Sequence, residues 1–421
     1  MKTILLTLLL LVFTGSGFAQ SDKQTITVTF WNWLPHMEQP FWDAAVEEYN
    51  KKHPGINIVI EWKTHDFMEI VGDFSTSLET RQHMPDVMSI EYFHWPEFLG
   101  NAFMNHLVDL TPLVERQRGN ISEASMAEFS HNGKKFAVSY QAAPFVFAYR
   151  EDLLRDNDIN PPLETWTDFY SAANRLKAKG IDLAMFDLSG AQAFFSLFLQ
   201  RGGKVFDENQ NFVFPNYRDE AVSVLNFMVS LNNEGLISDS KIADFMNGLE
   251  TRRFSQGEIA GLAAGDWILP RLKELHPELS GLWRVQPLPR WRDVGYDGVA
   301  NGGTGFAVVR RADRSADELN IIADFLVESV YSLKNQALFF KSRSLQMTNL
   351  ALFNNKSAIL MRDPYFDDQQ LALVLREAIK NSATRSIGAK YYEFNTRMNE
   401  LIRDVMSGKT TAEQALETFS L

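Results

Sequence analysis

Strand-like and helix-like patterns alternate over residues 26–90, and this order constrains the fold more than any other feature of the sequence. Residues 26–30 alternate in the period of two that is typical of a strand, and residues 40–53 carry an apolar face at helical spacing. Pro54 and Gly55 end that helix, and residues 56–62 and 84–90 predict two more strands with a helical stretch between them. A β-α-β-α-β order favours a mostly parallel sheet with helices on its faces, which is an α/β fold.

Polar and aromatic side chains follow each of these predicted strands. In sheets of this kind ligands bind at the carboxyl ends of the strands. The candidates are Trp33 and His36 after the first strand, Asp66 after the second, and Glu91, Tyr92 and His94 after the third. Trp31 is expected in the core, and the competing interpretation of His94 is a surface histidine or a satisfied core histidine.

A second structural unit begins near Gly133. Residues 136–140 and 145–149 predict two extended segments, and Thr165 with Asp168 forms a capping box at the start of a helix. A further helix is expected over residues 218–233, and residues 291–309 predict strand around a glycine-rich turn. Helices dominate after residue 317.

Composition excludes several classes of protein. The 421 residues suffice for two or three domains. A net charge of -12 repels polyanions and argues against nucleic-acid binding. Aromatic residues make up 12% of the chain, and a spare aromatic surface favours ligand stacking, although most rings are expected in the core.

The first nineteen residues have the pattern of a secretory signal peptide. Lys2 supplies a positive charge, residues 4–13 are apolar apart from Thr7, and Gly17 and Ala19 occupy the cleavage positions. The apolar run is shorter than the roughly 20 residues that span a bilayer. The chain has no cysteine, so it forms no disulfide and offers no thiol for a lipid anchor. We therefore expect an unlipidated periplasmic protein, with secretion into the medium as the alternative.

Motifs for catalysis or cofactor binding are missing from the sequence. It has no zinc-binding His and Cys spacing, phosphate loop, dinucleotide fingerprint or serine-hydrolase elbow in a suitable context. With 53 acidic residues, paired carboxylates for glycoside cleavage stay possible, but no local motif marks a pair. Tyr391 and Tyr392 are adjacent, as in some ferric-binding proteins, but packing or sugar stacking is the preferred interpretation. We expect no catalytic residue, metal or cofactor.

Seven short segments, in order along nearly the whole chain, carry a family resemblance. They are residues 27–33 with 49–56, 84–87, 137–140 with 148–154, 162–169, 254–257 with 265–267, 301–303 and 407–416. With these segments the chain resembles the bacterial extracellular solute-binding proteins, family 1, of sugar ABC transporters, the group that includes maltodextrin-binding protein. Two departures are Arg150, where the family usually has Asn, and a loop at residues 189–192 that is poor in aromatic residues.

The resemblance implies a two-lobed α/β protein with the type II periplasmic binding protein fold and a ligand cleft between the lobes. It places one lobe at residues 20–138 plus 287–345 and the other at 139–286 plus 346–421, with three crossing segments at a hinge. The lobes are expected to close over a sugar, and the permease subunits of an ABC importer are expected to recognise the closed form. We expect a monomer.

The resemblance also adds site candidates. Trp267 matches a ring that stacks on sugar in the family, and its competing interpretation is a core tryptophan. Gln141 lies at the inferred hinge, and Gly302 and Gly303 would let the backbone approach the ligand unless they only form a tight turn. Weaker candidates are Gln192, Arg385 and Tyr392.

Three classes of function stay open at the level of sequence. The first is a sugar-binding receptor for import, because aromatic faces pack on pyranose C–H groups and polar side chains pair with the hydroxyls. The second is a secreted carbohydrate-active enzyme, which lacks a motif. The third is a receptor for ferric iron, a phosphate ester or a polyamine, and the strand ends lack the clustered Arg and Lys that a phosphate ester requires.

Overall fold

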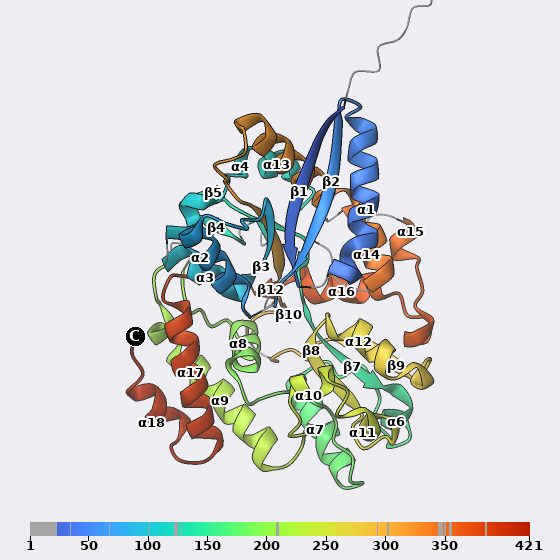
Figure 1. Cartoon of the computed structure of the whole chain (residues 1–421). Helices are drawn as coiled ribbons and strands as arrows, with labels where there is room; N and C mark the ends of the chain where they lie inside the picture. Colours follow the sequence, from blue (N-terminus) through green and yellow to red (C-terminus); the bar gives the residue numbers. More distant parts are fainter. Residues whose placement is uncertain are drawn as a thin grey trace, which may run out of the picture.

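A computed structural model describes residues 23–421 except 34, 67, 101, 122–124, 127, 208–209, 293, 301–302, 344–347, 349–350, 353–355 and 384 (Figure 1). The predicted signal peptide and Gly302 lie outside the described residues. Among the residues described, no helix combines the length and the apolar character needed to cross a membrane.

The first sheet contains the three strands predicted near the N-terminus. These are β1 (Gln24–Asn32), β2 (Ile56–Thr64) and β3 (Val87–Glu91), and β1 pairs in parallel with both of the others. The sheet continues through β11 (Thr304–Val308) to β6 (Val138–Ser139) in the order β2-β1-β3-β11-β6. β11 runs antiparallel to both of its neighbours, so a late segment of the chain separates two early ones.

Helices cover this sheet with aromatic side chains between the layers. Phe30 of β1 packs edge-on against Trp42 and Phe306, at ring-centre distances of 4.8 Å and 5.3 Å. The helices are α1 (Pro35–Lys52), α2 (Ile70–Thr80), α3 (Trp95–Gly100), α4 (Thr111–Val114), α13 (Ala316–Tyr331) and α14 (Leu333–Arg343).

Helix α1 begins five residues before the predicted start at residue 40. Pro40 lies inside the helix instead of opening it. The earlier turn holds Glu38, whose buried carboxylate accepts hydrogen bonds from Asn32 Nδ2 at 2.8 Å and from the Tyr140 hydroxyl at 3.0 Å. Because these tertiary contacts satisfy a buried polar group, they extend the helix beyond its local signal.

The second sheet has three antiparallel strands in the order β8-β7-β9: β7 (Phe145–Arg150), β8 (Gly261–Gly265) and β9 (Trp283–Pro287). Every residue of β7 is buried, because helices pack on both faces of this sheet. The predicted capping box of Thr165 and Asp168 is confirmed at the start of α7 (Trp166–Lys177). The helix predicted over residues 218–233 is α9 (Arg218–Asn233).

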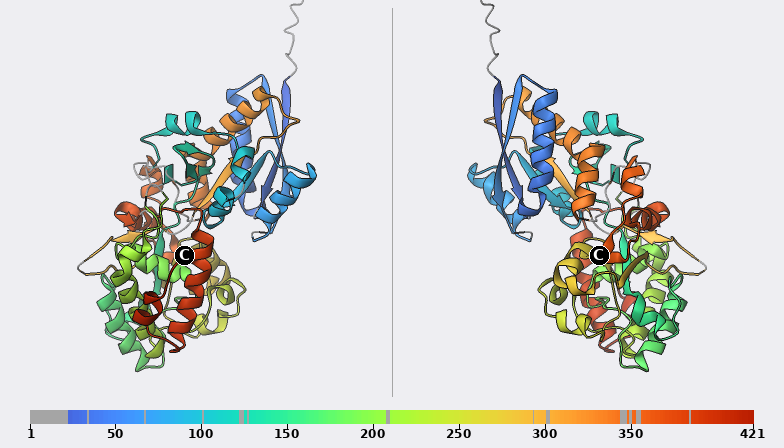
Figure 2. Two further views of the ribbon diagram at one scale, coloured as in Figure 1. Left: turned by 90° about the vertical axis from the view of Figure 1, so that its left-hand side faces the viewer. Right: turned by 90° about the vertical axis from the view of Figure 1, so that its right-hand side faces the viewer.

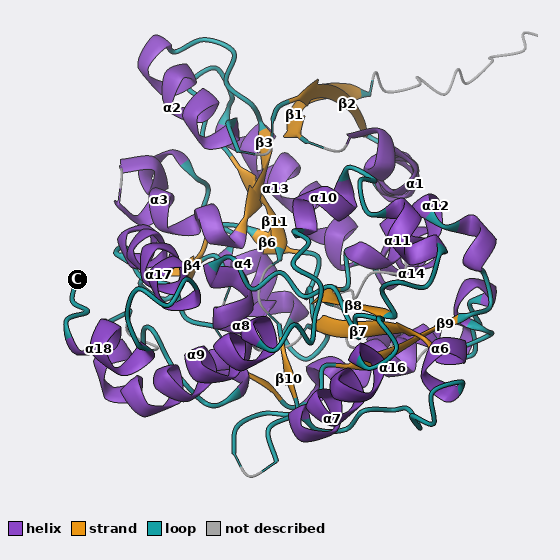
Figure 3. Ribbon diagram, turned by 90° about the horizontal axis from the view of Figure 1, so that it is seen from below, coloured by secondary structure: helices purple, strands orange, loops and turns teal. Residues whose placement is uncertain are grey.

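The remaining elements are short strands and further helices, which surround the strands of both sheets (Figure 3). Two small ladders pair β10 (Gly298–Val299) with β12 (Ser382–Ala383) and β4 (Ser130–His131) with β5 (Lys134–Lys135). The helices are α6 (Glu151–Arg155), α8 (Ala191–Gln200), α10 (Ile242–Met246), α11 (Thr251–Ser255), α12 (Ile268–Leu275), α15 (Lys356–Ile359), α16 (Leu371–Lys380), α17 (Tyr391–Met406) and α18 (Ala412–Glu417).

The two sheets lie in separate lobes, one above the other in Figure 2. The chain passes from the first sheet to the second between β6 and β7 and returns between β9 and β11. Helix α3 of the first lobe contacts α17 of the second. The lobe boundaries at 138/139, 286/287 and 345/346 stay proposals; the first falls inside β6, and residues 344–347 are not described.

Candidate functional site

The short segment between β6 and β7 places polar groups where the chain changes lobes. Ser139 ends β6 in the first sheet, whereas Gln141, two residues later, donates a hydrogen bond from Nε2 to Asp266 Oδ1 at 3.2 Å. Asp266 follows β8 of the second sheet and is fully buried, and its backbone N–H donates to the carbonyl of Pro144 at 2.9 Å. The candidate Gln141 therefore connects the crossing segment to the second lobe.

Two partly buried carboxyl groups lie at the first-lobe side of this crossing. Glu91, at the carboxyl end of β3, accepts a hydrogen bond from the hydroxyl of its cross-strand partner Thr304. Glu128 accepts one from Ser139 Oγ at 2.5 Å. Burial raises the pKa of each carboxyl to about 8, and the hydrogen bonds from Thr304 and Ser139 only partly oppose that rise. Both groups are therefore largely protonated at neutral pH and can donate as well as accept hydrogen bonds.

Gly303 brings the backbone close to Gln141 and Glu128, and its predicted approach to a ligand stays a prediction. Its φ of +151° is rarely adopted by other residues, and a Cβ built there would lie 2.8 Å from the Gln141 carbonyl oxygen and 3.3 Å from Glu128 Oε2. The Gly303 carbonyl accepts a hydrogen bond from the backbone N–H of Tyr92 at 2.9 Å. A side chain at position 303 would separate the crossing segment from the acids.

Tyr92 and Arg385, predicted from opposite ends of the chain, meet in the structure. The Tyr92 hydroxyl donates to the Arg385 carbonyl oxygen at 2.8 Å. The Arg385 guanidinium lies 5.6 Å from the ring centre of Tyr92, 5.5 Å from that of Phe195 and 4.6 Å from that of Tyr391. Burial lowers the pKa of Arg385 to about 10, and the three ring faces offset part of the cost of burying its charge.

The other predicted site residues lie in more varied surroundings. His94 is buried and pairs through Nδ1 with Glu97 Oε1 at 2.6 Å, and its role in ligand binding stays a prediction. Trp33 and Trp267 are half-buried beside the core. The exposed candidates are His36, Asp66, Gln192 and Tyr392. Asp66 Oδ1 accepts from the backbone N–H of Met68 at 2.8 Å, so it closes its own turn.

Sequence reasoning missed Glu38 and Glu128. Glu128 lies in a turn before β4, not at the end of a predicted strand, so no periodic pattern marks it. Glu38 lies in the turn of α1 that the pattern did not include. The adjacent tyrosines diverge, because Tyr391 is buried against Arg385 whereas Tyr392 is 65% exposed. They do not converge as two iron ligands would.

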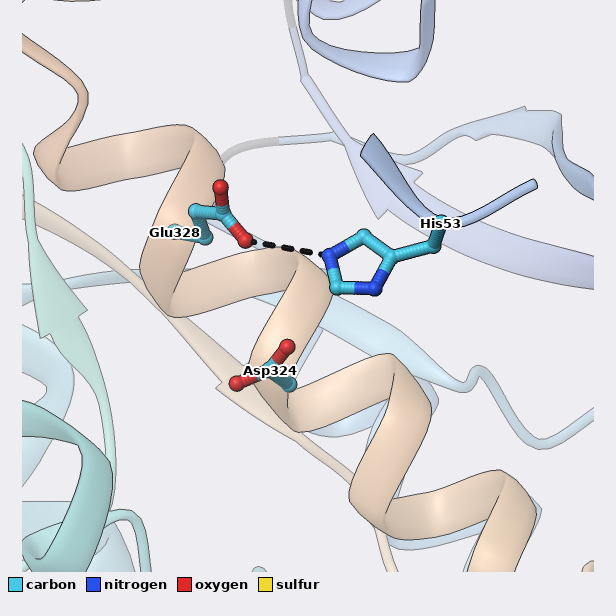
Figure 4. A group of neighbouring side chains, drawn as sticks. All are labelled: His53, Asp324 and Glu328. Carbon is cyan, nitrogen blue, oxygen red and sulfur yellow. Dashed lines mark hydrogen bonds and ion pairs between the residues drawn. The ribbon is translucent and has the colours of Figure 1, made fainter. Parts of the chain in front are cut away.

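One cluster of possible metal ligands connects α1 with α13 (Figure 4). Ligand atoms of His53, Asp324 and Glu328 lie within 4.8 Å of one another. Lys52 Nζ already lies 2.5 Å from Glu328 Oε1, and the Tyr49 hydroxyl donates to Asp324 at 3.2 Å. The Lys52 ammonium group already pairs with the Glu328 carboxylate, which a metal ion would need as a ligand. We therefore interpret the cluster as a polar connection between the two helices.

The architecture defines a class of protein: two α/β lobes joined by crossing segments, with buried polar groups at the crossing, make a two-lobed solute-binding protein. The chain belongs to the family of bacterial extracellular solute-binding proteins, whose model matches residues 35–326. This is a family of binding proteins that work outside the cytoplasm, in the periplasm or the extracellular space.

Relatives and solved structures agree with this assignment. The arabinooligosaccharide-binding protein of Bacillus subtilis (strain 168) is 26% identical over 313 residues, which cover 73% of this chain and 71% of the relative. The GacH receptor of Streptomyces glaucescens GLA.O has a TM-score of 0.73 at 20% identity, covering 94% of this chain and 96% of that one. An ABC transporter associated binding protein from B. animalis subsp. lactis Bl-04 has a TM-score of 0.72 at 19% identity, covering 93% and 95%.

Proposed function

We propose that the protein binds an oligosaccharide between its lobes, outside the cytoplasm, and delivers it to the permease subunits of an ABC importer. The observation that carries the proposal is the cluster of polar groups, partly buried Glu91 and Glu128 with buried Gln141, where the chain crosses between lobes. Protonated carboxyl groups and an amide both donate and accept, and sugar hydroxyls require such partners. The named ligand of the Bacillus subtilis relative supports the same class of solute.

Closure of the lobes is part of this proposal. A ligand shifts the lobes toward a closed state only by the extra contacts it makes there. Trp33 and Glu91 are the proposed contacts from the first lobe, and Trp267 and Gln192 those from the second. A crossing of a few residues, such as 140–144, can act as the hinge because few dihedral angles have to change.

A thermal-shift screen against arabino-, malto- and galacto-oligosaccharides tests the proposal, because a ligand that binds only the native state raises the unfolding temperature. Small-angle scattering with the best ligand should then show a smaller radius of gyration. Size-exclusion chromatography checks the expected monomer. No shift with any oligosaccharide, in a protein that unfolds cooperatively, would contradict the proposed function.

A hydrolase is the second candidate, and one observation favours it. Two neighbouring carboxyl groups with raised pKa values, Glu91 and Glu128, are the kind of pair that can supply a general acid. We propose that the ligand is nevertheless returned unchanged, in keeping with a family of binding proteins. Chromatography of the bound sugar after a day decides the question. Cleavage that disappears in Glu128→Gln would establish the enzyme.

A further inference from the structure

His65 directly follows β2, at the end of the first sheet that faces the second lobe. Strands β1 and β2 run in parallel, and both end toward that lobe (Figure 1). The backbone N–H of His65 donates to the Asn32 carbonyl of β1 at 3.1 Å, so the pairing of the two strands extends to this residue. The register therefore places His65 next to position 33, whose tryptophan is a proposed ligand contact.

The His65 ring is held on two sides by its own lobe. Its Nδ1 lies 2.6 Å from Asp73 Oδ2 of α2. One face of the ring packs on Trp31, with the ring centres 3.9 Å apart, and Trp31 is itself buried in the core. A ring that is already fixed loses little conformational entropy when a ligand binds to it, which favours its use as a contact.

The contact with Asp73 also determines which nitrogen of the His65 ring carries the proton. A carboxylate only accepts hydrogen bonds, so Nδ1 is the protonated nitrogen, and Nε2 of the neutral ring offers a lone pair. Within the described part of the chain Nε2 makes no hydrogen bond, and it is open to solvent and not buried. His65 thus presents one fixed, unpaired acceptor atom at the end of β2.

The polar neighbours of His65 are already engaged. Lys63 Nζ lies 2.8 Å from Glu61 Oε1, and Asp66 Oδ1 closes its own turn by accepting a backbone hydrogen bond. We propose that Nε2 of His65 accepts a hydrogen bond from a hydroxyl group of the bound sugar, and that Asp73 is a positioning residue that keeps this nitrogen unprotonated.

The inference rests on the proposed function and adds a residue that determines specificity. Trp33 would pack on the C–H face of a sugar ring, while His65 would pair with a hydroxyl at the edge of that ring. An acceptor with a fixed proton position requires a donor, and an ether oxygen cannot supply one. A site built in this way rejects an analogue that lacks the hydroxyl. The ligand class is therefore an oligosaccharide with a free hydroxyl beside its stacked face.

Calorimetric titration of the full protein with α-1,5-arabinotriose, maltotriose and β-1,6-galactobiose tests the inference. The variant His65→Phe keeps a ring that stacks on Trp31 but has no nitrogen. We expect it to bind each sugar that the wild type binds about three- to tenfold more weakly, as loss of one hydrogen bond predicts.

The matched control is His53→Phe. His53 also packs on an aromatic ring, that of Tyr49, at 4.1 Å between ring centres, and it also pairs with a carboxylate, that of Glu328, at 3.4 Å. It precedes β2 instead of following it, so at about 3.3 Å per strand residue it lies about 30 Å from His65. Its replacement should leave the affinity for every sugar unchanged.

Nitrogen-15 NMR of the histidine-labelled protein locates the contact independently. The His65 signals, assigned by their loss in His65→Phe, should show the proton on Nδ1. A bound sugar should shift the Nε2 signal of His65 and leave the His53 signals in place. In Asp73→Ala the proton is free to move to Nε2, so we expect the signal of a protonated Nε2 and binding weakened by about two- to fivefold. Glu79→Ala, at an exposed position of the same helix, should change neither.

Unchanged affinity in a folded His65→Phe variant, or weaker binding without a sugar-induced shift of Nε2, would overturn the contact. Weaker binding in Asp73→Ala with the proton still on Nδ1 would overturn the positioning role. Should His65→Phe not fold, the Nε2 shift in the wild type, assigned through Asp73→Ala, decides alone. Each of these results leaves the receptor function intact if the wild type binds a sugar. If none of the three sugars binds, the proposed function fails and the His65 contact fails with it.

Discussion

The Tyr92 hydroxyl donates a 2.8 Å hydrogen bond to the backbone carbonyl of Arg385, and this bond joins residues 293 positions apart in the chain. Tyr92 follows β3 of the first lobe, and Arg385 precedes α17 of the second. The bond therefore connects the lobes without using the crossing segments, and any change in the angle between the lobes has to alter it.

Tyr92→Phe should loosen the connection between the lobes while preserving both cores. Loss of one buried hydrogen bond lowers the free energy of unfolding by about 0.5–1.5 kcal/mol, and here it removes the donor to the Arg385 carbonyl. We expect a lower midpoint in urea and a larger radius of gyration without ligand. Tyr296→Phe is the control, because its hydroxyl has no hydrogen bond among the described residues. An unchanged radius in Tyr92→Phe would show that this bond does not restrain the lobes.

Stability should fall as pH rises from about 5 to 8, because of Glu91 and Glu128. Their pKa values are about 8 in the folded chain and close to the ordinary glutamate value of 4.5 in the unfolded chain. The folded state then binds more protons in this range, so the stabilisation present below pH 4.5 is lost as pH passes the folded pKa.

The variant Glu128→Gln tests whether the Glu128 carboxyl group has a raised pKa, because glutamine keeps hydrogen-bonding capacity without ionising. Above pH 8 this variant should be more stable than the wild type by about 1–2 kcal/mol, the cost of ionising a buried group that it avoids. Glu400→Gln, at an exposed position on α17, should leave the pH profile unchanged. Chemical unfolding at a series of pH values measures both. Parallel profiles for the wild type and Glu128→Gln would contradict the raised pKa.

Gly303→Ala should lower both stability and ligand affinity. The new Cβ would lie 2.8 Å from the Gln141 carbonyl, and the φ of +151° disfavours alanine, at a cost of about 1–3 kcal/mol. Gly72→Ala, in α2 with no atom within 4 Å of the new Cβ, should instead stabilise the protein by about 0.5–1 kcal/mol. Thermal unfolding and sugar titration measure both variants. Unchanged binding in a folded Gly303→Ala variant would remove this turn from the proposed site.

Trp267→Ala should weaken oligosaccharide binding at least about tenfold, because a stacked ring contributes both buried area and geometry. Trp267 is half-buried at the start of α12, so its removal should cost less stability than that of a core ring. The control is Trp291→Ala, another half-buried tryptophan, which contacts Arg201. If Trp267→Ala unfolds at much lower temperature with unchanged affinity, the core interpretation is correct.

Local signals in the sequence predicted most elements, and long-range pairing explains the rest. The alternation of residues 26–30 and 56–62 identified β1 and β2, because one face of each is buried. The insertion of β11 between β3 and β6 depends on contacts across more than 150 residues, which no local pattern encodes. The two-lobed organisation was predicted from the family resemblance and not from periodicity.

The positions of the candidate site residues were predictable at strand ends and not in turns. Glu91 ends β3 and Tyr92 follows it, close to where both were expected, whereas Glu128 reaches the same place from a turn with no periodic signal. Their raised pKa values could not be predicted either, since burial by distant segments causes them. The ligand contacts of Trp33, Trp267 and Gln192 stay predictions.

The position of β11 also determines the order in which the molecule can be assembled as the chain emerges. All three strands of the second sheet fall within residues 145–287, so that sheet can form from one continuous segment. The first sheet is incomplete until residues 304–308 have been synthesised and have paired between β3 and β6. Until then β3 exposes an unpaired, apolar strand edge, which is a template for aggregation. The sheet whose strands are synthesised first is therefore completed after the other one, and its N-terminal strands keep an open edge while the intervening chain is made.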